Sequence, residues 1–178
     1  MKKFYIFSAI VALFLAGCYP AAKKGIPLPV PEYRIDEETE KRINRYLSQV
    51  EIICQNSESL DAVGQSTMTQ TARLIDVGEA ASPMLVAILR DKSKDWKFRY
   101  WACDLLGYIP DEKNVLPLIA IIEDPLEEEK IRLCALEAVV ETGNPEIVEY
   151  LEVAEEIVEN DAVKEEIRIT LEKLGGKK

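Results

Sequence analysis

Apolar residues recur with a helical period along the second half of the chain, and the pattern itself repeats. The stretch 98–111, FRYWACDLLGYIPD, returns 33 positions later as 131–144, IRLCALEAVVETGN, with an arginine in second place in both copies. A period in the thirties is typical of solenoids built from stacked helix pairs. The pattern predicts first helices at 95–107, 128–141 and 161–174, and second helices at 81–90, 112–123 and 145–158.

The segment before the repeats also has a helical pattern. A helix is predicted from an acidic first turn at Asp36 to about Asn56, because apolar residues recur there at i, i+4, i+7 and i+11. These apolar positions are Ile43, Leu47, Val50 and Cys54. Residues 58–71 are also predicted to be helical, followed by a turn at Gly78 and a helix with Pro83 in its first turn. The expected fold of residues 36–176 is all-α, a short right-handed α-solenoid of stacked helix pairs.

Polar residues and glycines lie where these helices should begin and end. N-cap side chains that accept a free backbone N–H are expected at Asp95, Asp111, Asn144 and Asp161. Glycines that follow helix ends in a left-handed conformation are expected at Gly107, Gly143 and Gly175.

The N-terminus has a different composition from the rest of the chain. Lys2 and Lys3 precede an apolar run from 4 to 16. Gly17 and Cys18 follow it, so that the segment closes with Leu15-Ala16-Gly17-Cys18. This order predicts a secretory signal at 1–17, too short for a permanent membrane span. Residues 18–35 carry four prolines and predict a semi-stiff tether, which could hold the folded part up to roughly 45 Å from a bilayer.

The sequence LAGC after such a region resembles the lipobox of bacterial lipoproteins. The resemblance implies that Cys18 is acylated and becomes the first residue of the mature protein, anchored to a membrane outside the cytoplasm. The alternative is an ordinary cleavable signal with an incidental cysteine. Because Tyr19 rather than aspartate follows the cysteine, the resemblance favours the periplasmic face of the outer membrane if the organism has two membranes.

Residues 72–91 and 98–124 resemble HEAT-like repeats of the kind named in phycobilisome lyases, and the resemblance extends over 72–174. It implies a stacked-helix scaffold and does not specify a function. In that family a ladder of acidic and basic residues fastens each loop to the next helix. Three pairs eight residues apart fit such a ladder, unless they are coincidence in a highly charged chain: Asp91 with Arg99, Asp124 with Arg132 and Glu156 with Lys164.

The charge of the chain narrows the classes of function. With 22 basic and 32 acidic residues the net charge is −10, which argues against nucleic-acid binding and against lying flat on anionic lipid. The chain has no histidine, no glycine-rich phosphate loop and no catalytic triad. We therefore expect no enzyme, no cofactor, no metal site and no small-molecule substrate. The expectation for Cys54, Cys103 and Cys134 is buried thiols, with a Cys103–Cys134 bridge left open.

Two groups of residues are candidates for a partner surface. The helix at 145–158 should bury one apolar stripe and present the acidic residues Glu149, Glu152 and Glu156 on its other face, either as a wall of the concave surface or as a solvated face. Three aromatic residues cannot all face inward from one helix: Trp96, Tyr100 and Trp101. The expected function is a lipid-anchored adaptor for another envelope protein; the alternative is an accessory or pilotin-like subunit of a larger envelope complex.

Overall fold

The computed structural model of the chain describes residues 35–109 and 111–175. Within these ranges the chain forms α-helices and short 3₁₀ turns and contains no strand. The α-helices are α1 (Glu37–Asn56), α2 (Leu60–Val77), α3 (Ser82–Arg90), α4 (Trp96–Tyr108), α5 (Val115–Glu123), α6 (Glu129–Glu141), α7 (Ile147–Ile157) and α8 (Asp161–Leu174). The 3₁₀ turns at Gly78–Ala81 and Glu112–Asn114 lead into α3 and α5. The prediction of an all-α solenoid is confirmed.

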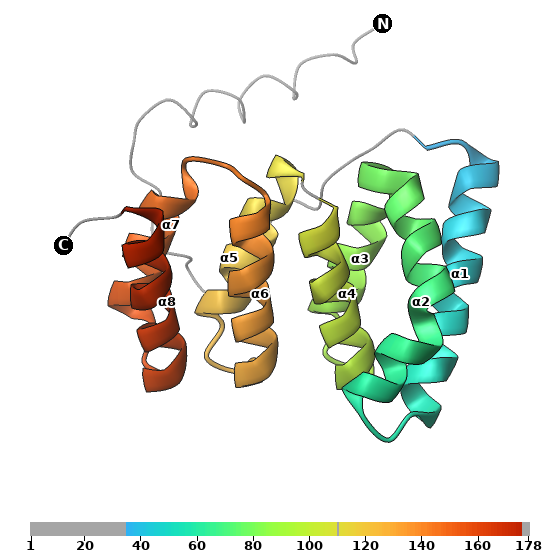
Figure 1. Cartoon of the computed structure of the whole chain (residues 1–178), viewed down its shortest axis with the longest axis horizontal. Helices are drawn as coiled ribbons and strands as arrows, with labels where there is room; N and C mark the ends of the chain where they lie inside the picture. The colour runs from blue at the N-terminus through green and yellow to red at the C-terminus, as the bar shows by residue number, and fades with distance from the viewer. Residues whose placement is uncertain (1–34, 110, 176–178) are drawn as a thin grey trace, which may run out of the picture.

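The helices stack in pairs along the long axis of the molecule (Figure 1). The second helix of each pair packs on a first helix, so that α3 lies on α4, α5 on α6 and α7 on α8. Contacts of α4 with α6 and of α6 with α8 join the first helices into one layer, and α5 also packs against α7. At the N-terminal end, α1 and α2 pack against each other and both contact α4.

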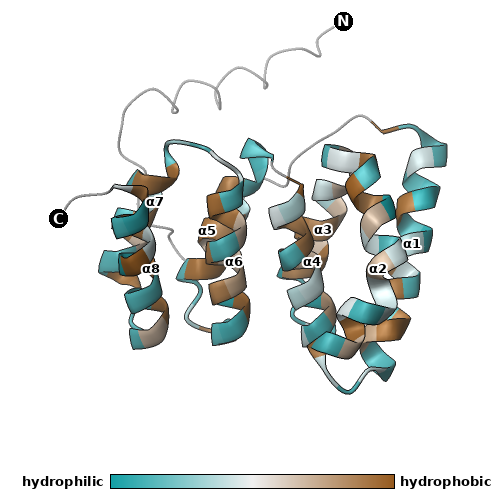
Figure 2. Cartoon of the chain, viewed as in Figure 1, coloured by the Kyte–Doolittle hydropathy of each residue, from teal (hydrophilic) through white to brown (hydrophobic). Residues whose placement is uncertain are grey.

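A continuous apolar core runs through the stack, and the hydrophobic sides of the helices face it (Figure 2). The predicted stripe of α1, from Ile43 to Cys54, is buried, and so is the stripe of α7 from Ile147 to Val158. Helix α5 is the most apolar of the set, because it is enclosed by neighbours and buries six of its nine residues. Each pair therefore completes its core only against the next pair, as expected for a solenoid.

Polar side chains cap α1, α4 and the 3₁₀ turn that leads into α5, whereas α7 begins at Ile147 with Glu146 rather than the predicted Asn144 at its N-cap position. The carboxylates of Asp36, Asp95 and Asp111 accept hydrogen bonds from the backbone N–H groups of residues two or three positions ahead, at 2.8–3.0 Å. The prediction for α8 is wrong by one residue. Asn160 caps α8 by accepting from the N–H of Val163 at 2.9 Å, and Asp161 is the first helical residue.

The glycine expected at the end of α4 has a different role. Gly107 lies inside α4, whereas Gly143 and Gly175 adopt the predicted left-handed conformation with φ of 67° and 79°. A Cβ atom at Gly107 would lie only 3.3 Å from the Cα atom of Ala138 on α6. Gly107 thus allows α4 and α6 to approach closely, and the reason for a glycine there is tertiary packing rather than helix termination.

This packing predicts that substitutions at two helical glycines change the stability in opposite directions. Gly107→Val should lower the free energy of unfolding by about 1–3 kcal/mol, because the added side chain overpacks the contact with Ala138. Gly64→Ala on α2 is the control, since a Cβ atom there meets nothing within 4 Å, and it should raise stability by about 0.5–1 kcal/mol. Urea unfolding measures both changes, and a Gly107→Val variant as stable as the wild type would contradict the close approach.

Candidate functional site

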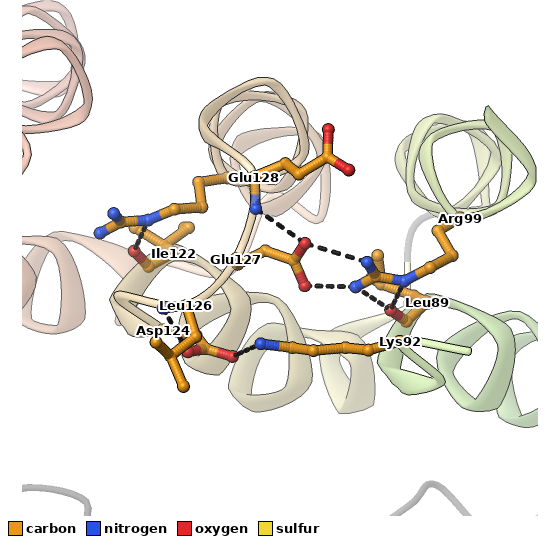
Figure 3. Close-up of polar contacts among 9 residues, drawn as sticks. Leu89, Lys92, Arg99, Ile122, Asp124, Leu126, Glu127 and Glu128 are labelled. Atoms are coloured by element: carbon orange, nitrogen blue, oxygen red, sulfur yellow. Dashed lines mark hydrogen bonds and ion pairs between the residues drawn. The ribbon is translucent and has the colours of Figure 1, made fainter. Parts of the chain in front are cut away.

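A buried arginine joins α3, α4 and the loop before α6 (Figure 3). The Arg99 guanidinium on α4 donates from Nε and Nη2 to the carbonyl oxygen of Leu89, at the end of α3, at 2.9 and 2.8 Å. It also forms a bidentate ion pair with Glu127, in the loop before α6, with Nη1 at 3.0 Å from Oε1. The backbone N–H of Glu128 donates to the same carboxylate at 2.9 Å. Both charged side chains are almost completely buried, so this contact fixes α4 against the next repeat.

The next repeat keeps only half of this arrangement. Arg132 on α6 donates from Nε to the carbonyl oxygen of Ile122 at 2.8 Å, as Arg99 does to Leu89. In the described part of the chain it forms no ion pair with a carboxylate. The loop before α8 has three residues, 158–160, against five in the loop 124–128. The shorter loop explains why no acidic side chain reaches Arg132 as Glu127 reaches Arg99.

The predicted ladder is therefore wrong, because none of its three acidic–basic pairs forms an ion pair in the described residues. Each arginine binds a carbonyl oxygen two residues before the expected acidic partner. Asp91 instead accepts from the N–H and hydroxyl of Ser93 in its own loop. Asp124 forms an ion pair with Lys92 across two repeats at 2.6 Å. No ion pair joins Glu156 to Lys164, both of which the structure describes.

Helices α4 and α6 enclose a groove on the layer of first helices. It has a volume of about 400 Å³ and is lined by Asp104, Gly107, Tyr108, Cys134, Glu137, Ala138 and Glu141. We call this set the acidic groove. Two small members, Gly107 and Ala138, mark the close approach of the two helices, and three carboxylates and Tyr108, which is 61% exposed, belong to the same lining.

The carboxylates of the acidic groove have no cationic partner in the described residues. Partial burial, together with the nearby charge of Glu137, raises the pKa of Asp104 above its ordinary value. Like charges held together without compensation weaken the fold and are a common sign of a binding site. These residues are not among the candidates predicted from the sequence, although Asp104 with Glu137 and Tyr108 with Glu141 coincide when the repeats are superposed.

A second hollow continues the acidic groove onto the last repeat. It lies between α6 and α8, has a volume of about 220 Å³ and shares Glu137 and Glu141 with the acidic groove. Glu166 adds a further carboxylate, and Lys173 lies 4.0 Å from it. The negative side chains thus follow the layer of first helices over two neighbouring repeats.

The predicted acidic row on α7 belongs to the other layer of the solenoid. Glu149 and Glu156 are exposed and Glu152 is half-buried. Two apolar side chains interrupt the row, Val153 at 50% and Ile157 at 44% exposure. The row is an exposed face with mixed character, and its use by a partner stays a prediction.

The aromatic candidates are largely taken up by packing. Trp101 is buried, stacks on Phe98 with ring centroids 6.0 Å apart, and donates from Nε1 to the hydroxyl of Thr71 at 3.1 Å. Trp101 therefore does not lie on a partner surface. Trp96 is half-buried, and the Lys130 ammonium stands 2.9 Å from its ring centre. Tyr100 is also half-buried, and burial raises its pKa to about 12.

Several predictions concern the N-terminus. Cys18, the signal at 1–17 and nearly all of the tether at 18–35 lie outside the described residues. Among the helices that the structure describes, none is long and apolar enough to cross a membrane. The same part of the chain contains no cluster of three metal-ligating side chains.

The comparison with protein families agrees with this geometry. Residues 82–174 match the HEAT repeats family, which covers more than half of the chain. The chain belongs to the HEAT repeat family. A search of curated proteins found no match. Stacked HEAT repeats generally serve as scaffolds for protein interactions, and the fold is typically not enzymatic.

Breaking the buried ion pair should destabilise the fold more than breaking an exposed ion pair between repeats. Glu127→Gln should lower the free energy of unfolding by about 3–5 kcal/mol, because the Arg99 charge then stays buried without a counter-charge. Lys92→Met removes the exposed pair with Asp124 and should cost less than about 1 kcal/mol. Urea denaturation measures both variants. Equal losses would contradict the special role of the buried pair.

Proposed function

We propose that this protein is a lipid-anchored adaptor of the bacterial cell envelope that binds a basic segment of another envelope protein in the acidic groove. The HEAT repeats support an interaction scaffold in general. The single observation that carries the proposed basic partner is the groove itself: Asp104, Glu137 and Glu141 line it together with small residues and form no ion pair with a cation in the described part of the chain.

The lining of the groove matches the chemistry of lysine and arginine side chains. Their aliphatic stems can lie along Gly107, Ala138 and the exposed ring of Tyr108, while their charged ends meet the carboxylates. A bound cation would also relieve the repulsion between Asp104 and Glu137, which adds to its attraction to the groove. The negative field of the groove would speed association with a basic partner. The same field would repel nucleic acid and anionic lipid.

The N-terminal sequence supports the membrane anchor. A basic start, an apolar run and LAGC occur in the order of a lipoprotein signal, and Cys18 is the residue that would carry the acyl chains. The prolines after Cys18 would then separate the solenoid from the bilayer. In this arrangement the partner is recruited to the membrane by equilibrium binding, without a chemical step. In a two-membrane organism we place the protein on the periplasmic face of the outer membrane, because Tyr19 follows the cysteine.

The exposed face of α7 favours a second candidate function. Val153 and Ile157 are unusually exposed apolar residues, and the acidic residues Glu149 and Glu156 border them. Such a face suits a permanent contact in a larger complex, with the protein as an accessory or pilotin-like subunit. The two functions use opposite layers of the solenoid and are separable by mutation.

Binding of a fluorescent peptide of lysine, arginine and leucine should depend on the acidic groove. Removing three ion pairs of about 0.5–1 kcal/mol each by Asp104→Asn, Glu137→Gln and Glu141→Gln should weaken binding roughly 10- to 100-fold. The matched control removes the same charge from α7 by Glu149→Gln, Glu152→Gln and Glu156→Gln, and should leave the affinity within about twofold. Fluorescence anisotropy measures both, and a greater loss in the α7 variant favours the accessory-subunit function instead.

The lipid anchor gives an independent prediction. Cells supplied with an alkyne fatty acid should label the wild-type chain, which should sediment with membranes. Cys18→Ser should abolish the label and release the chain, because Cys18 is the acylation site. Cys54→Ser is the matched control, since Cys54 is buried in the core and should not affect labelling. Labelling that survives Cys18→Ser would contradict the anchor.

A further inference from the structure

Two buried cysteines lie on α4 and α6, which pack against each other. Cys103 on α4 and Cys134 on α6 are buried, free thiols, and the Cys134 side chain is among the groups that raise the pKa of the Cys103 thiol. Cys134 Sγ also lies 3.9 Å from the carbonyl oxygen of Tyr100, one turn before Cys103. The thiol of Cys134 therefore lies against the turn of α4 that leads to Cys103.

The backbones of these helices are close enough for a covalent bridge. One turn after the two cysteines, Gly107 and Ala138 make the close approach described above, with the same offset of 31 positions between the helices. A disulfide needs Cα atoms about 4.4–6.8 Å apart and Cβ atoms that point toward each other. Two thiols with the same offset, one turn before this close approach, are placed where a rotation of the side chains can bring them together.

We propose that Cys103 and Cys134 form an intramolecular disulfide when the protein meets an oxidising disulfide. The bridge would join two successive repeats directly beneath the acidic groove. It does not depend on the proposed function, because it follows from the packing of α4 on α6 alone.

Access to the two sulfur atoms sets the order of the reaction. Cys134 lines the acidic groove, whereas Cys103 is completely buried. The Cys134 thiolate attacks one sulfur of an external disulfide RSSR and displaces RS⁻, which leaves a mixed disulfide on Cys134. The Cys103 thiolate then attacks the Cys134 sulfur and displaces the second RS⁻. The two protons of the thiols pass to the departing thiolates, so that the external disulfide is reduced to two RSH.

The surroundings of Cys103 make this a slow reaction. Burial, and then its contact with Cys134, raise the pKa of the Cys103 thiol well above the ordinary value, so the thiolate is scarce. The second step, attack by Cys103, should therefore limit the rate at which the bridge forms. Cys54 serves as an internal reference, because burial raises its pKa to about 12 and no second thiol contacts it in the described residues.

Incubation of the full chain with oxidised glutathione, followed by denaturation, alkylation and tryptic mass spectrometry, tests the proposal. Cys54, Cys103 and Cys134 fall in the separate tryptic peptides 46–73, 100–113 and 133–164, and Cys18 falls in a fourth, 4–23. The expected product is a cross-link of 100–113 with 133–164, while the peptide with Cys54 is alkylated. The oxidised protein should unfold at a temperature roughly 5–10 °C higher than the reduced one.

Single variants separate the steps of the reaction. Cys103→Ser should stop at a glutathione adduct on Cys134, and Cys54→Ser should leave the cross-link unchanged. The proposal is overturned if Cys103 and Cys134 of the wild-type chain both stay alkylatable, if the glutathione adduct stays on Cys134, or if either cysteine is bridged to Cys54. Because the wild-type peptide map decides among these results, the test does not depend on folding of the Cys103→Ser variant.

Discussion

The buried ion pair between Arg99 and Glu127 is the contact on which the rest of the solenoid depends. Removing two charges from water is costly, and here the carbonyl oxygen of Leu89 and the N–H of Glu128 offset that cost by completing the hydrogen bonds. The pair fixes α4 against the loop before α6, and Gly107 lets the two helices touch. Both the acidic groove and the placement of the two buried thiols are consequences of this register.

Most of the fold follows from the repeat, and the exceptions have physical reasons. The 33-residue period and the cap residues place helices α3 to α8 within a few residues of their observed bounds. Gly107 has the sequence signature of a helix end, but its role depends on Ala138, which is 31 positions away. Arg99 was matched with the nearby Asp91, whereas a distant loop brings Glu127 to it. Such contacts between repeats depend on loop length, which a local pattern does not encode.

The candidate site was less predictable than the fold. Asp104, Glu137 and Glu141 each resemble ordinary solvated residues of an acidic helix, and they form a site only when α4 and α6 lie side by side. The superposed repeats contain a signal, since Asp104 and Glu137 share one position. For the aromatic cluster the sequence predicts a surface where the structure has core. Tryptophan is common in binding surfaces, but Trp101 is buried in the core. The lipid anchor is expected from sequence motifs alone.

Hydrogen exchange of the full chain, with and without the basic peptide, tests the central claim that the acidic groove is the binding surface. Bound peptide should slow amide exchange in 100–108 and 134–141, the two walls of the groove, because binding holds α4 and α6 together. Exchange in α7 should not change. Protection confined to α7, or no protection in either segment at a saturating peptide concentration, would contradict the account.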